Sequence, residues 1–245
     1  MNQQKKRPTQ EEFHLHKLDE RHKLENPLRD VILGGQDGLV NALGIILGIT
    51  AVTSDIHILI ATVLAASFAE SISMGAVAYT SALSQKDFYE SERHKENREI
   101  DTVPEMEKEE VRRIYEEKGL KGKVLEEVVD TITSDKKIWL DTMMAEELHI
   151  EPVNTKAVLK SSVIVTIATL IGHLIPLFPF FFVAHLPGLI IAIFLSAITL
   201  FIVGAYQAAT LVGSWWKVGL RMVLIGLFAA ALGYLIARLF HASAG

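Results

Sequence analysis

The stretch from Ile164 to Val183, IVTIATLIGHLIPLFPFFFV, contains no Asp, Glu, Lys or Arg. A run of about 20 apolar residues is long enough to cross the hydrocarbon core of a bilayer as a helix. A second stretch without these charges, LIIAIFLSAITLFIV, covers residues 189–203. Together they indicate a membrane protein rather than the buried core of a soluble helical protein.

The apolar segments form two blocks separated by a highly charged middle. The first block, residues 31–83, breaks near 54–57, and the second, residues 157–240, breaks near 185–187 and again near 215–217. The sequence therefore predicts an all-α membrane protein with five transmembrane helices and a cytoplasmic helical metal-binding domain inserted between helices 2 and 3. The predicted segments are a polar cytoplasmic N-terminal tail at 1–27, helices 1 and 2 at 28–88, the inserted domain at 89–152, and helices 3 to 5 at 153–245.

The distribution of Lys and Arg predicts the orientation. Thirteen lie between Lys86 and Lys156 and seven precede or open the first span, whereas the loops at 54–57 and 184–187 have none. Because cytoplasmic loops carry the excess of Lys and Arg, the N-terminus and the insert are expected to face the cytoplasm. The polar first 27 residues do not resemble a signal peptide, so the first transmembrane helix is expected to target the chain to the membrane.

Acidic side chains lie within two of the predicted spans. Asp37 is followed one turn later by Asn41 in the first span, and Glu70 is followed one turn later by Met74 in the second. An ionised carboxylate in hydrocarbon is costly and marks an ion or proton pathway. We expect these four residues to line a cation path, with snorkelling or structural pairing of the acids as the alternative. His173, in the third span, is expected to be packed or hydrogen-bonded rather than a ligand.

The insert is acidic, with 20 Asp and Glu against 13 Lys and Arg between residues 86 and 156. This balance argues against nucleic acid as a partner and suits the capture of cations. Glu96 and Glu99 are three residues apart, as are Glu107 and Glu110, so each pair shares one helix face. The alternative is a solvated acidic face balanced by nearby Lys and Arg. A capping box is predicted at Thr102 and Glu105.

The last helix of the insert is predicted to start at a cap on Ser134 or Asp135 and to reach His149. It places Met143 and Met144 one turn before Glu147. Thioether beside carboxylate favours a transition-metal ion over Mg²⁺ or Ca²⁺, although paired methionines are also common core residues. The chain has no cysteine, so any metal must bind through oxygen, nitrogen or thioether sulfur.

Five spaced motifs resemble those of the vacuolar iron transporter family of plants and yeast and their prokaryotic relatives. The resemblance covers about residues 28–240, and the motifs are Gln-Asp-Gly-Leu at 36–39, Ile-Ser-Met-Gly at 72–75, Thr-Val-Pro at 102–104, Trp-Leu-Asp-x-Met-Met-x-x-Glu at 139–147 and Gly-x-x-x-Pro-Leu-x-Pro at 172–179. The resemblance implies a homodimer whose translocation path runs between the two copies. It also implies export of Fe²⁺ from the cytosol in exchange for protons, with no enzymatic activity and no organic cofactor.

Family members of the plant type line the path with residues that correspond to Asp37 and Met74. The metal ligands that the resemblance implies for the insert are Glu96, Glu99, Glu107, Glu110, Met143, Met144 and Glu147. Two positions depart from that pattern. Plant-type members have a glutamate in the second span at the position that is Ala66 here, whereas this chain has Glu70 one turn later. They also have a lysine in the fourth span at the position that is Gln207 here. Whether Glu70 replaces the missing glutamate, and hence whether transport is strictly coupled to protons, stays open.

Three other functions fit parts of the sequence. A transporter of the same architecture could carry Mn²⁺, Co²⁺ or Zn²⁺ as well as Fe²⁺. A membrane-tethered ferroxidase would use Glu146-x-x-His149 and Glu11-x-x-His14, since di-iron helical proteins use Glu-x-x-His pairs. A metal sensor would need the spans only as anchors, which Asp37 and Glu70 argue against. The protein is expected in the cell membrane of a prokaryote or a vacuolar-type membrane of a eukaryote.

Overall fold

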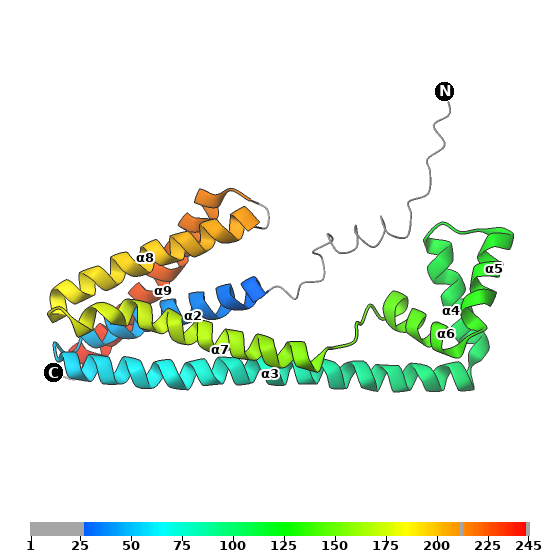
Figure 1. Cartoon of the computed structure of the whole chain (residues 1–245), viewed down its shortest axis with the longest axis horizontal. Coiled ribbons are helices and arrows are strands. Elements are labelled where there is room, and N and C mark those ends of the chain that lie inside the picture. The colour runs from blue at the N-terminus through cyan, green and yellow to red at the C-terminus, as the bar shows by residue number, and fades with distance from the viewer. Residues whose placement is uncertain (1–26, 211–212, 244–245) are drawn as a thin grey trace, which may run out of the picture. The chain divides into compact units, whose positions relative to one another are not determined.

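The computed structural model describes residues 27–210 and 213–243, and these ranges contain helices and no strands. Residues 1–26 of the N-terminal tail, with Glu11 and His14, lie outside the described residues. Five described helices are long and apolar enough to cross a membrane, which confirms the predicted number. They are α2 (Pro27–Thr50), α3 (Ile56–Thr102), α7 (Thr155–Leu177), α8 (His185–Thr210) and α9 (Trp215–Ser243) (Figure 1).

Shorter helices connect α3 to α7 along the chain. They are α4 (Pro104–Glu117), α5 (Gly122–Thr133), α6 (Lys136–Thr142) and the π-helical turn η2 (Met143–Glu147), while the 3₁₀ turn η3 (Phe178–Phe181) follows α7. The chain forms two compact units. One contains the described residues up to Met74 and from Val163 onward, and the other, called the inserted unit below, is Gly75–Ser162. The cytoplasmic position of the inserted unit stays a prediction.

Helix α3 is a single helix of 47 residues. At 1.5 Å per residue it is about 70 Å long, more than twice the thickness of a hydrocarbon core. Its apolar part, residues 56–83, is sufficient to span the membrane, so the charged part from Gln85 to Thr102 lies beyond the spanning segment. The predicted continuation of the second span as a polar helix is therefore confirmed.

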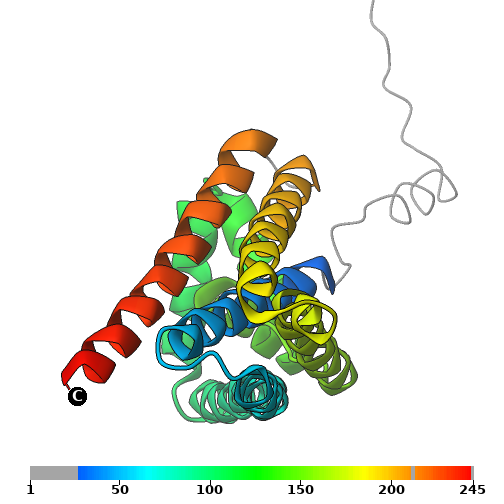
Figure 2. The same ribbon diagram turned by 90° about the vertical axis from the view of Figure 1, so that its left-hand side faces the viewer.

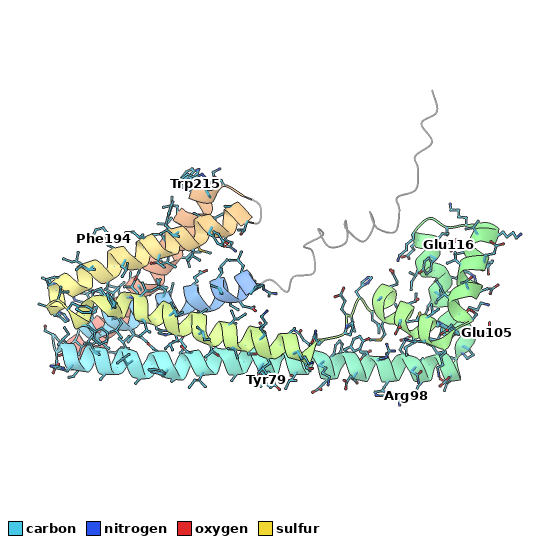
Figure 3. All side chains as sticks on the ribbon, viewed as in Figure 1. Tyr79, Arg98, Glu105, Glu116, Phe194 and Trp215 are labelled. Carbon is cyan, nitrogen blue, oxygen red and sulfur yellow. The ribbon has the colours of Figure 1, made fainter. Side chains whose placement is uncertain are left out.

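Helix α2 lies among the other spanning helices (Figure 2). Small residues make this arrangement possible because they let helix backbones approach closely within a membrane. A Cβ on Gly34 would lie 2.6 Å from the carbonyl oxygen of Val165 on α7. On the side of α2 that faces α9, a Cβ on Gly44 would lie 3.9 Å from the Cα of Ala230. Apolar side chains such as Phe194 of α8 and Trp215 of α9 point outward, as expected for surfaces that contact lipid (Figure 3).

The inserted unit has its own apolar core, formed by α4, α5, α6 and η2 with the end of α3. Gly119 and Gly122, at the break between α4 and α5, have φ values of 98° and 58°, which favour glycine. Of the two predicted caps of α6, Asp135 is the one used: its carboxylate accepts hydrogen bonds from the backbone N–H groups of Lys137 and Ile138.

Two local predictions for the insert are wrong. The N-cap of α4 is Val103, without a side-chain cap, because Thr102 still belongs to α3 and its hydroxyl donates to the carbonyl oxygen of Arg98 at 2.9 Å. The last helix does not continue regularly to His149. It changes to a π-helical turn at Met143, where the N–H of Leu148 donates to the Met143 carbonyl oxygen at 3.2 Å. His149 follows with a left-handed φ of 54°.

Candidate functional site

Polar side chains from three spanning helices meet at Glu70, and we call Asp37, Asn41, Glu70 and His173 the membrane polar cluster. The amide of Asn41 on α2 donates a hydrogen bond to Oε1 of Glu70 on α3. Nε2 of His173 on α7 lies 2.9 Å from the other oxygen, Oε2. Glu70 is therefore held from both sides.

Asp37 completes this cluster from α2, one turn before Asn41. Its carboxyl group is partly buried and interacts electrostatically with Glu70 and His173. Two of the acids predicted to line a path are thus neighbours in space. Met74 is partly buried one turn after Glu70 on α3. Among the described residues, Ser67 and Ser71 are also buried on α3, but their hydroxyls bond to the carbonyl oxygens of their own helix at 2.6 Å.

His173 has no solvent exposure, and its Nδ1 lies 2.8 Å from the carbonyl oxygen of Thr169. The prediction that it is hydrogen-bonded is confirmed. Its partner is Glu70, 103 residues away along the chain, which local sequence patterns do not predict. The available signal was a polar residue in an otherwise apolar span, a position that usually faces the interior of a helix bundle.

The close packing of α2 against α7 brings this cluster together. A Cβ on Gly38 would lie 2.2 Å from the Thr169 carbonyl oxygen and 2.7 Å from Nδ1 of His173. A Cβ on Gly172 would lie 2.4 Å from the carbonyl oxygen of Gly35. Side chains at these positions would push the helices apart, so the glycines set the distance between α2 and His173.

The inserted unit contains a second group of acidic residues, centred on Glu96 of α3 and Glu107 of α4. Each is only 5% exposed, and the two carboxyl groups are hydrogen-bonded to each other. Oε1 of Glu96 and Oε2 of Glu107 are buried without a hydrogen-bond partner. The alternative of a solvated acidic face is wrong for these two residues, and Lys108, which could have balanced them, pairs with Asp130 at 2.6 Å.

Three further carboxylates interact with this pair. Burial, and then the hydrogen bond between Glu96 and Glu107, raise the pKa of Glu96 to about 8. Partial burial, followed by repulsion from Glu107 and Glu99, raises the pKa of Glu110. The pKa of Glu147 is likewise raised, by partial desolvation and then by Glu110, Glu107 and Glu99. The five glutamates predicted as ligands therefore form one electrostatic group, the insert carboxylate group.

Met143 and Met144 are both buried in the core of the inserted unit. They are the first two residues of the π-helical turn, which ends at Glu147. Such turns are rare and occur frequently at functional sites. Among the residues that the structure describes, no three His, Cys, Asp or Glu side chains are arranged to hold a metal ion. The partnerless oxygens of Glu96 and Glu107 nevertheless provide buried acceptors of the kind that a cation needs.

The described pair of the ferroxidase alternative, Glu146 and His149, makes other contacts. Glu146 forms an ion pair with Lys118, and His149 is exposed with its Nδ1 3.2 Å from the carbonyl oxygen of Ala145. The other pair, Glu11 and His14, lies outside the described residues. Gln207, at the position of the expected lysine, has a buried side-chain oxygen without a hydrogen-bond partner.

Comparison with known proteins identifies the family. The vacuolar iron transporter of Centaurea cyanus is 32% identical over 216 residues, which cover 86% of each chain. Vacuolar iron transporter 1 of Arabidopsis thaliana is 31% identical over 213 residues, covering 86% of this chain and 85% of the relative. The vacuolar iron transporter of Plasmodium berghei is 30% identical over 246 residues, covering 95% and 90%. A family model described as the VIT family matches residues 28–238, and this chain therefore belongs to that family.

Proposed function

We propose that this protein is a transporter of divalent transition-metal ions, with Fe²⁺ as the main cargo, that exports the ion from the cytosol in exchange for protons. The observation that carries the proposal is the meeting of Asp37 and Glu70 within the spanning helices. Ionisable residues inside a membrane are rare and mark ion or proton pathways. Several relatives named vacuolar iron transporters support iron as the cargo.

The inserted unit supplies the ion in this proposal. Its carboxylates and the thioethers of Met143 and Met144 collect Fe²⁺ on the cytoplasmic side. Buried carboxylates that repel one another are stabilised when a cation neutralises them. Thioether ligands favour a transition-metal ion over Mg²⁺ or Ca²⁺.

Asp37, Asn41, Glu70 and Met74 then line the path through the membrane, between the two copies of a homodimer. Metal binding requires deprotonated carboxylates, so an ion and protons compete for the same oxygen atoms. This competition is the physical basis proposed for exchange of the ion against protons.

Uptake by proteoliposomes tests the proposal. The purified protein is reconstituted with an acidic interior and a pH-sensitive dye, and Fe²⁺ is added outside under anaerobic conditions. Fe²⁺ uptake accompanied by a rise of the internal pH is expected for the wild type, and its loss for Asp37→Asn. Asp87→Asn, an exposed position on the charged part of α3, is the matched control. Equal uptake by the wild type and Asp37→Asn would refute the proposed path.

Competition and crosslinking complete the test. Fe²⁺ uptake is measured with Mn²⁺, Co²⁺ or Zn²⁺ added in excess, which ranks these ions against Fe²⁺ as cargo. If Mn²⁺ suppressed Fe²⁺ uptake most strongly, Mn²⁺ would be the main substrate. Chemical crosslinking in nanodiscs measures the oligomeric state, for which a dimer is expected.

A further inference from the structure

The protonation and contacts of His173 follow from its two neighbours. Nδ1 lies 2.8 Å from the carbonyl oxygen of Thr169. A carbonyl oxygen can only accept a hydrogen bond, so Nδ1 carries a hydrogen. The other ring nitrogen, Nε2, lies 2.9 Å from Oε2 of Glu70. The imidazole thus connects the backbone of α7 to a carboxyl group of α3.

The packing of α2 leaves little free space beside this ring. Nδ1 of His173 would lie only 2.7 Å from a Cβ on Gly38. The neighbouring Gly172 is in equally close contact with α2, since its own Cβ would lie 3.0 Å from the N of Leu39. With no exposed surface, His173 has no route to water, and a buried polar ring without partners is costly. The hydrogen bond to Glu70 therefore gives a partner to a ring nitrogen that would otherwise be buried without one.

The carboxyl group of Glu70 is oriented by this arrangement. Oε2 is held by His173 from α7 and Oε1 by Asn41 from α2. Two bonds from different helices fix the plane of the carboxyl group as well as its position. Each carboxylate oxygen can accept more than one bond, so these two bonds do not use all the acceptor sites of Glu70.

We propose that His173 is a positioning residue of the membrane path, which acts through Glu70 by holding its carboxyl group in the orientation that accepts the cation. This inference rests on the function proposed above and deepens it. It gives α7 a role in a path otherwise assigned to α2 and α3. Residues that orient a ligand without touching the metal typically contribute about 10- to 100-fold to metal affinity.

Two substitutions of His173 separate positioning from packing. The side-chain amide of His173→Gln can reach the place of Nε2 and form a hydrogen bond with Glu70, whereas that of His173→Asn ends near the place of Nδ1. Both variants are polar and fill less space than imidazole, so they should be comparably stable. In proteoliposomes we expect His173→Gln to keep a KM for Fe²⁺ close to that of the wild type. His173→Asn should raise the KM about tenfold or more. Equal KM values for the two variants, or the reverse order, would overturn the proposal.

A double-substitution cycle tests whether His173 acts through Glu70. In a Glu70→Ala background, His173→Asn is expected to cause no further rise of the KM, because the group that it positions is already missing. A rise in that background as large as in the wild type would show that His173 acts independently and overturn the inference.

A spectroscopic measurement keeps this inference separate from the proposed function. The infrared carboxyl band of Glu70, identified by its loss in Glu70→Gln, can be recorded without any transport. We expect this band to shift in His173→Asn and to stay in place in His173→Gln. A wild-type protein that fails to transport would refute the proposed function alone, whereas a band unchanged in both variants would refute the positioning role.

Discussion

Glu96 of α3 and Glu107 of α4 are hydrogen-bonded to each other through their carboxyl groups, although each is only 5% exposed. Such a bond requires a proton on one of the two groups, since two carboxylates can only accept. With the pKa of Glu96 at about 8, the metal-free protein keeps this proton at neutral pH. The proton must leave before both carboxylates can bind a metal ion.

Metal affinity of the inserted unit should therefore rise with pH. Between pH 6 and 8 we expect the apparent affinity for Co²⁺, used as an air-stable probe, to increase by up to about tenfold per pH unit, the slope for one released proton. Calorimetry of the full-length protein in two buffers with different ionisation enthalpies should give about one proton released per ion at pH 7. An affinity independent of pH would contradict this account of the Glu96–Glu107 pair.

The stability of the metal-free protein should change in the opposite direction. A glutamate whose pKa is raised on folding binds more protons in the folded state, so its contribution to stability is lost as pH rises from about 4.5 to about 8. Glu96→Gln mimics the protonated form and should flatten this dependence while weakening Co²⁺ binding. Hydrogen exchange at the amides of α4, corrected for its intrinsic pH dependence, measures the effect. The control is Glu105→Gln, at an exposed position of α4 (Figure 3), which should behave like the wild type.

Replacing the buried thioethers should alter metal preference more than stability. Met143→Leu and Met144→Leu nearly conserve side-chain volume, which usually costs less than about 1.5 kcal/mol. Because leucine offers no sulfur, the ratio of Fe²⁺ to Mn²⁺ affinity should fall in both variants. Met106→Leu is the control, since Met106 lies in the same unit but is 65% exposed. A ratio equal to that of the wild type would assign both methionines to the core alone.

Gly38→Ala should disturb the membrane polar cluster. The new Cβ would lie 2.2 Å from the Thr169 carbonyl oxygen, a backbone atom that cannot move aside by itself. We expect a loss of about 1–3 kcal/mol in stability, as for overpacked cores, together with reduced Fe²⁺ uptake. Gly35→Ala is the control on the same helix, because its Cβ would meet the Ala168 carbonyl oxygen at an ordinary 3.8 Å. Thermal unfolding in detergent should separate the two variants, and equal unfolding temperatures would argue against a tight α2–α7 contact.

Much of the fold could be predicted from the sequence because hydropathy acts over local segments. Stretches without charge predict spans wherever they occur, and the polar residues around Asp55 separate α2 from α3. The cap on Asp135 is likewise a local pattern. The prediction of a capping box at Thr102 was wrong because the long helix α3 includes that residue, which local spacing does not reveal.

The partners of the acidic residues could not be predicted in the same way. The apolar segment around Glu70 predicts that this residue lies in a span, but its bonds to Asn41 and His173 depend on how three helices pack. That packing is decided by glycines whose importance is visible only when the opposing backbone is known. Similarly, spacing places Glu96 and Glu99 on one helix face, whereas the burial of Glu96 against Glu107 is a property of the folded unit.

The π-helical turn Met143–Glu147 means that this part of the chain contains one residue more than an α-helix would need there. The relation of the two methionines to Glu147 is consequently encoded in the length of the backbone. Deleting Ala145 would allow regular α-helical bonding and would bring Glu147 from four residues after Met143 to three, which changes the spacing between the methionines and the carboxyl group. No exchange of one side chain for another has this effect. Insertions and deletions, rather than substitutions, are therefore the changes through which this segment could lose or acquire a binding geometry.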